Sequence, residues 1–138
     1  SALLSILAVA FLSGCFRAGN RRKEEAVRNF ERGNFAACID KANQAVPILE
    51  ARLNDSCTLI WDMWLGESLH VRGHCKKAIG HLPEAIADLQ LAVERLNIVC
   101  HRKCGLNGRY MKKSCETAAN ATETLTQWKK ELASKDKP

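Results

Sequence analysis

The 138-residue sequence lacks long apolar runs, low-complexity segments and short catalytic motifs. Its three prolines and eight glycines exclude a collagen-like or low-complexity chain. No Gly-x-Ser-x-Gly, P-loop, His-Glu-x-x-His or dinucleotide-binding motif occurs. Basic residues interleaved with aromatic ones, which would indicate nucleic-acid binding, are absent too. We therefore expect a protein that is not an enzyme, with no small-molecule substrate and no nucleic-acid partner.

The charge of the chain is basic but dispersed. Lysine and arginine number 21 against 15 acidic residues, which gives a net charge of +6. The basic residues are spread along the sequence and include residues around Arg21 at one end and around Lys130 at the other. Such a distribution is typical of a solvated surface.

The segment from Ser1 to Phe16 contains the most apolar stretch, which is about 12 residues long. A membrane-spanning helix needs about 20 apolar residues. The observed length instead fits the hydrophobic region of a signal peptide. The segment has no initiator methionine and no basic start, so we expect that the front of the gene product is missing.

Leu12-Ser13-Gly14-Cys15 ends this stretch and resembles the lipobox of bacterial lipoproteins, Leu-[Ala/Ser]-[Gly/Ala]-Cys, at every position. The resemblance implies that residues 1–14 are removed as a signal peptide. Cys15 would carry a diacylglycerol and usually a further acyl chain, and these suffice for stable anchoring. Phe16, rather than aspartate, follows the cysteine, which implies the outer membrane and its periplasmic face. Residues 15–22 would form a tether. The alternative is an uncleaved N-terminal helix.

Beyond the anchor, apolar residues recur at helical spacing and predict an all-α fold. Five helices are expected: about residues 22–32, 35–53 and 56–79, a fourth from Pro83 to a turn at 105–108, and a fifth over about residues 109–133. The tail, residues 134–138, is expected to fray.

Two glycine turns within this region are similar to each other. Residues 33–39, followed by Ala42 and Ala45, and residues 80–86, followed by Leu89 and Ala92, resemble the middle of a tetratricopeptide repeat. The turns lie further apart than the 34 residues of a regular repeat. The resemblance implies antiparallel helix hairpins over residues 23–133, stacked as an irregular right-handed superhelix whose concave surface binds a protein partner.

Seven cysteines are present, and setting Cys15 aside leaves six, the number that three disulfides require. Cys57 and Cys75 lie five turns apart on one expected helix, about 27 Å, so they cannot pair with each other. Facing positions on antiparallel neighbours pair Cys57 with Cys104 and Cys100 with Cys115. Cys38 and Cys75 remain as the third pair. Such a framework indicates an oxidising compartment.

A metal site is a weaker alternative for the same residues. Its candidate ligands are His70, His74, Cys75, Cys100, His101 and Cys104. These residues contain no Cys-x-x-Cys knuckle of the kind that binds zinc. The motif from Cys100 to Cys104, Cys-His-x-x-Cys, does not have the order of a haem-attachment motif, which is Cys-x-x-Cys-His. We therefore expect no metal and no cofactor other than the lipid on Cys15.

Two further groups have structural interpretations. Glu84, Asp88 and Glu94 have the spacing of a solvated helix face. Trp61 and Trp64 are expected in the core more than on a binding platform.

The sequence thus predicts a lipid-anchored scaffold of the bacterial envelope that binds a protein partner through a helical-repeat surface. A structural accessory subunit of a membrane complex, held by an uncleaved N-terminal helix, is the alternative. A metal-binding or redox protein is a third, weaker possibility.

Overall fold

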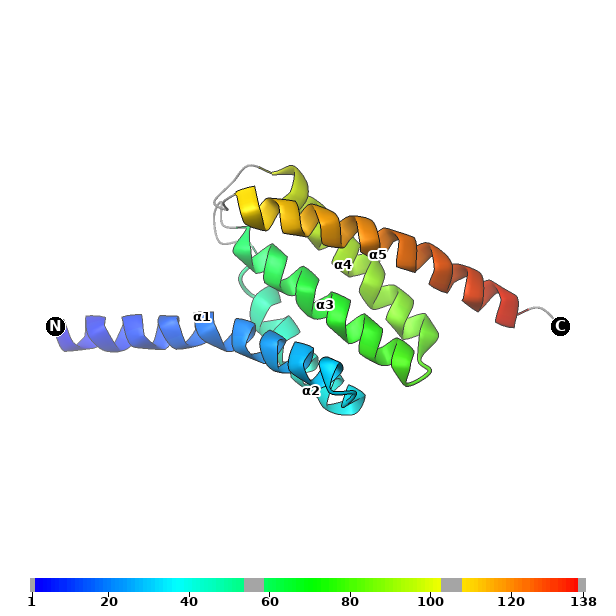
Figure 1. Cartoon of the computed structure of the whole chain (residues 1–138). Coiled ribbons are helices and arrows are strands. Elements are labelled where there is room, and N and C mark those ends of the chain that lie inside the picture. The colour runs from blue at the N-terminus through cyan, green and yellow to red at the C-terminus, as the bar shows by residue number, and fades with distance from the viewer. Residues whose placement is uncertain (1, 54–58, 103–107, 137–138) are drawn as a thin grey trace.

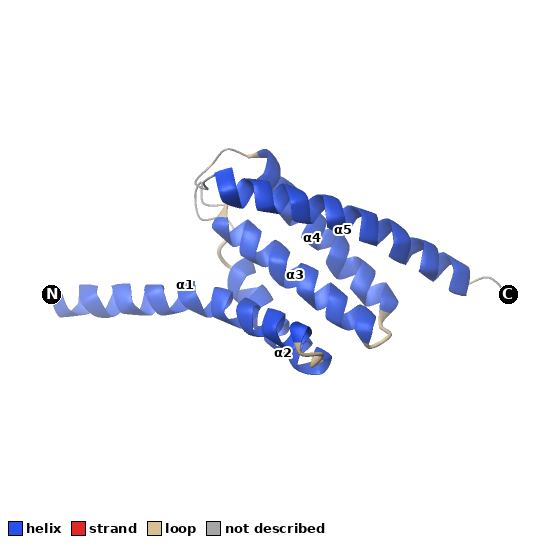
Figure 2. Cartoon of the chain, in the orientation of Figure 1, coloured by secondary structure: helices blue, strands red, loops and turns tan. Residues whose placement is uncertain are grey.

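The computed structural model describes residues 2–53, 59–102 and 108–136, with residues 2–16 described by their backbone alone. Over these residues the fold is all-helical, as predicted (Figure 2). Figure 1 shows the elements in chain order: α1 (Ala2–Glu31), α2 (Phe35–Glu50), α3 (Ile60–Ala78), α4 (Leu82–His101) and α5 (Gly108–Lys135).

Each helix packs antiparallel against the next one along the chain, and α1 also contacts α3 (Figure 1). The two predicted glycine turns join α1 to α2 and α3 to α4. Gly33 and Gly80 have φ angles of 76° and 88°, which glycine adopts without strain. In both turns the glycine amide donates to the carbonyl three residues back and the next amide to the carbonyl five residues back. This is the Schellman arrangement, and it ends both helices in the same way.

The first helix is longer than the sequence predicts. Instead of beginning near Arg22 after a tether, α1 is continuous from Ala2, through Cys15, to Glu31. Gly19 is buried, and a Cβ atom placed on it would lie 2.7 Å from Leu49 Cδ2. The lack of a side chain therefore allows α1 to approach α2 closely, and the packed region begins before Lys23.

Other predicted boundaries shift by a few residues. The second helix ends at Glu50 rather than Leu53, because the amides of Arg52 and Leu53 bond to carbonyls only three residues back. The fifth helix continues to Lys135, about two residues beyond the predicted end near residue 133. The predicted start of the third helix at Ser56 lies outside the described residues.

The core consists of three apolar clusters that follow the stacking of the helices. One joins α1, α2 and α3 around Ala26, Ala42 and Val71. The largest joins α2, α3 and α4, and it contains Trp61 and Trp64, as predicted. The third joins α4 to α5 around Leu89, Leu125 and Trp128.

Two disulfides link neighbouring helices in the predicted pairing. Cys38 of α2 bonds to Cys75 of α3, with 6.5 Å between their Cα atoms. Cys100 of α4 bonds to Cys115 of α5, with 4.8 Å between Cα atoms. The predicted pair Cys57–Cys104 lies outside the described residues.

Asp88 corrects another expectation. It is only 4% exposed, not part of a solvated face. Its carboxylate accepts two 2.8 Å hydrogen bonds from Arg72 and lies 2.9 Å from the Lys76 ammonium. Arg72 also donates to Asn43 at 3.0 Å. This network ties α2, α3 and α4 together.

Candidate functional groove

A groove runs between α1, α3 and α5, with a cavity of about 510 Å³. The residues that line it are Val27, Phe30 and Glu31 from α1, Glu67, His70, Val71 and His74 from α3, and Lys113 and Thr117 from α5. Because three helices far apart in sequence contribute, the stacking of the hairpins creates the groove. We refer to it as the α1–α3–α5 groove.

Aromatic rings form one wall of the groove. His70 and His74, one turn apart on α3, have ring centroids 4.7 Å apart. His74 also packs at 5.0 Å against Trp128 of α5 and at 6.0 Å against Phe30 of α1. Phe30 is 37% exposed, although it is large and apolar. An open aromatic surface of this kind favours contact with another molecule.

Both histidines are neutral at pH 7. Burial, and in second place the charge of the neighbouring His74, lower the pKa of His70 to about 4. Burial also lowers the pKa of His74. The aromatic wall therefore carries no charge at neutral pH.

Charged side chains occupy the rim. Glu67 of α3 forms a salt bridge with Lys23 of α1, with 2.9 Å between the carboxylate oxygen and the ammonium nitrogen, and both side chains are largely buried. Glu31 and Lys113 lie on α1 and α5 respectively and are exposed. The groove thus combines an apolar aromatic wall with separated charges of both signs, a combination that suits a polypeptide segment.

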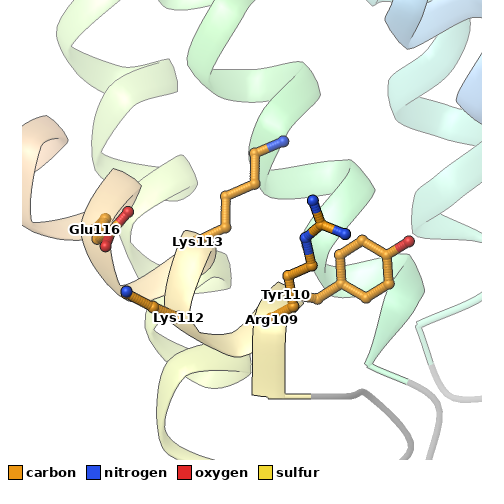
Figure 3. A pocket seen from close by; sticks show the side chains of 5 residues that line it. All are labelled: Arg109, Tyr110, Lys112, Lys113 and Glu116. Atoms are coloured by element: carbon orange, nitrogen blue, oxygen red, sulfur yellow. The ribbon is translucent and has the colours of Figure 1, made fainter.

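A second hollow, of about 450 Å³, lies at the start of α5 (Figure 3). Arg109, Tyr110, Lys112, Lys113 and Glu116 line it. Figure 3 shows Arg109 and Lys113 reaching toward α3, while Lys112 and Glu116 lie on the other side of α5. One helix, α5, supplies all of the lining of this hollow, whereas three helices line the groove.

The alternative metal ligands do not come together in the described part of the chain. Cys75 and Cys100 are in disulfides with Cys38 and Cys115, and His101 is exposed at the end of α4. No group of three or more potential ligands lies close together among the described residues. Cys104, the last candidate, lies outside them.

The site residues predicted from the sequence lie in separate parts of the structure. His70 and His74 are in the groove. Cys15 lies within α1, in the part described by its backbone alone. Phe30, Lys113 and Thr117 were not identified from the sequence, because nothing local shows that α1 and α5 flank the same face of α3. The spacing of Glu67, His70 and His74 on one helical face was the available signal.

No helix in the described residues is both long enough and apolar enough to cross a membrane. No family model, curated protein or solved structure matches the chain.

Proposed function

We propose that this chain is a lipid-anchored scaffold of the bacterial envelope, on the periplasmic face of the outer membrane, and that it is not an enzyme. The lipobox residues, Leu12 to Cys15, support the anchor. The disulfides Cys38–Cys75 and Cys100–Cys115 support an oxidising compartment such as the periplasm. Tetratricopeptide-like stacking is part of the proposal, and the matching Schellman turns at Gly33 and Gly80 support it.

The activity that we propose is capture of a segment of a protein partner in the α1–α3–α5 groove. The observation that carries it is the row of rings formed by Phe30 of α1 and by His74 and His70 of α3, which line the groove. The buried Trp128 of α5 packs against His74 from the core side. The disulfide Cys38–Cys75 fixes α3 against α2, so the wall is formed before a partner arrives. Preorganisation of this kind lowers the entropic cost of binding.

Site-specific photo-cross-linking in cells tests this activity. A benzoylphenylalanine at Thr117 places the probe in the groove. The same probe at Thr126, two and a half turns further along α5, points the opposite way and is the matched control. We expect a discrete cross-linked product from position 117 that is absent from position 126.

The substitution Phe30→Asp is the second part of the cross-linking experiment, because it places a charge in the aromatic wall of the groove. The product from position 117 should then disappear while the helical circular dichroism spectrum is retained. Identical products from both probe positions, or a product that Phe30→Asp leaves unchanged, would contradict binding in the groove.

A structural accessory subunit, held by an uncleaved N-terminal helix, is the second candidate. The observation that favours it is the continuity of α1 from Ala2 through Cys15 to Glu31. The N-terminal sequence of the native protein separates the two candidates, since a scaffold anchored through Cys15 begins at that residue.

A further inference from the structure

One end of the bundle combines basic charge with proximity to Cys15. A cavity lined by Lys23 of α1, Ile60 and Trp64 of α3 and Tyr110 of α5 shows that these parts of the three helices lie together. The contact of Gly19 with Leu49 brings the end of α2 to the same place. We call this the anchor end.

The fourth helix ends there as well. Arg95 of α4 lies 3.4 Å from Asp62 at the start of α3, and Cys100 is bonded to Cys115 of α5. The anchor end therefore comprises the packed beginning of α1, the end of α2, the start of α3, the end of α4 and the start of α5. Figure 1 shows the N-terminal half of α1 leaving the bundle on this side.

Exposed basic side chains from three helices gather at the anchor end. They are Arg17 and Arg21 from α1, Arg102 from the end of α4, and Arg109, Lys112 and Lys113 from α5. Among the described residues, exposed acidic side chains at the same end are fewer: Glu24, Glu50, Glu94 and Glu116. No ion pair is found for Arg102, Arg109 or Lys112 within the described part of the chain. The end surface is therefore positively charged and solvated.

Cys15 is close to this surface. It precedes the buried Gly19 by four residues of continuous helix, which is a rise of about 6 Å. A lipid on Cys15, or an inserted helix that ends there, would therefore bring the anchor end to the depth of the phospholipid headgroups.

We propose that the anchor end docks on the anionic phospholipid surface of the membrane that holds the N-terminal segment. The contact holds the bundle end-on, with the C-terminal part of α5 directed away from the lipid. The proposal rests on the membrane anchoring in the proposed function, but not on whether the anchor is a lipid or an uncleaved helix. It deepens that function, because it fixes how the groove is presented to a partner.

Continuity with the apolar segment favours a membrane over a soluble acidic partner. The basic residues lie at the end of the bundle where this segment leaves it, and they do not form an enclosed site. Tyr110 is 42% exposed and lines the hollow at the start of α5. Its amphipathic ring is of the type enriched at membrane interfaces. Each lysine or arginine near an anionic surface strengthens attachment about 5-fold.

The test compares binding of the full chain to vesicles of phosphatidylcholine alone and of phosphatidylcholine mixed with phosphatidylglycerol. The variant neutralises three basic side chains of the anchor end: Arg102→Gln, Arg109→Gln and Lys112→Gln. The matched control neutralises three at the other end of α5: Lys129→Gln, Lys130→Gln and Lys135→Gln. Both variants lose the same net charge, and all six side chains are exposed, so the fold should be unaffected.

We expect the wild-type chain to prefer the anionic vesicles and the anchor-end variant to lose this preference by on the order of 100-fold. The control variant should retain most of it. Equal losses in the two variants, or a wild-type chain without the preference, would overturn the proposal.

The neutral vesicles keep this test separate from anchoring. A chain that binds them without preferring anionic lipid contradicts the docking proposal alone. A chain that binds only anionic vesicles contradicts the anchor and supports the docking.

Tyr110 offers a direct readout of orientation, because it is the single tyrosine of the chain. Enzymatic iodination should label Tyr110 in the wild type on neutral vesicles and be strongly reduced on anionic ones. Equal labelling on both would contradict end-on docking.

Discussion

His74 of α3 packs edge-on against Trp128 of α5, with ring centroids 5.0 Å apart and planes inclined at 72°. Because α5 packs mainly on α4, this contact ties α5 to α3 as well. Trp128 is 6% exposed and belongs to the apolar cluster between α4 and α5, so its ring supports His74 from the core.

Trp128→Ala should lower the free energy of unfolding by about 3–5 kcal/mol, since it empties a large buried volume. Urea denaturation followed by circular dichroism measures the loss. Leu132→Ala, at a half-buried position one turn further along α5, is the comparison and should cost less. Similar losses at the two positions would show that the His74–Trp128 contact adds nothing specific to the free energy of unfolding.

Stability should fall as the pH is lowered from about 6.5 to about 4. Burial lowers the pKa of His70 to about 4 in the folded chain, while the unfolded chain binds the proton near pH 6.5. The folded state therefore binds fewer protons over this range, and the loss from His70 is on the order of 3 kcal/mol.

Denaturation at a series of pH values measures this dependence. His70→Gln stays neutral throughout, so its stability should depend less on pH than that of the wild type. His81→Gln, at an exposed histidine, is the matched control and should follow the wild type. Parallel curves for wild type and His70→Gln would contradict the assignment.

The two disulfides should differ in their resistance to reduction. Cys38 and Cys75 are fully buried, whereas Cys100 and Cys115 are only partly buried. A water-soluble reductant should therefore open Cys100–Cys115 first in the native protein. Timed alkylation and peptide mass spectrometry give the order, and earlier labelling of Cys38 or Cys75 would contradict it.

Removing each disulfide should also cost stability. The bridges close loops with sequence separations of 37 and 15 residues. Restriction of the unfolded chain then contributes about 4 and about 3 kcal/mol respectively. The double variants Cys38→Ser/Cys75→Ser and Cys100→Ser/Cys115→Ser should show losses of this order in denaturation experiments.

Asp88→Asn should lower the free energy of unfolding by about 2–3 kcal/mol, because Arg72 and Lys76 would lose their shared anionic partner. Glu84→Gln, at an exposed position on the same helix, should change it by less than about 0.5 kcal/mol. An equally small effect at Asp88 would show that the network does not join the hairpins.

Local patterns in the sequence predicted much of the fold. The apolar spacing indicated the helices, and the glycines at 33 and 80 marked turns that local hydrogen bonds complete. The pairing Cys100–Cys115 followed from the register of antiparallel neighbours, and Cys38–Cys75 followed as the remaining pair. Each of these features depends on residues that are close in sequence or on adjacent helices.

Features that depend on the stacking of hairpins were not predictable in this way. Asp88 has the spacing of a surface residue, and its burial requires Arg72 and Lys76 from α3. Gly19 gave no sign that α1 begins to pack before Lys23, because the cause is the position of Leu49 on α2. Likewise, the groove requires α1 and α5 on the same side of α3.

The N-terminal peptide of the protein extracted from bacterial membranes tests the proposed lipid anchor most directly, and its mass can be measured by mass spectrometry. We predict a peptide that begins at Cys15 and carries the added mass of a diacylglycerol and an acyl chain. A peptide in which the bond between Gly14 and Cys15 is intact and the Cys15 thiol is unmodified would contradict the account.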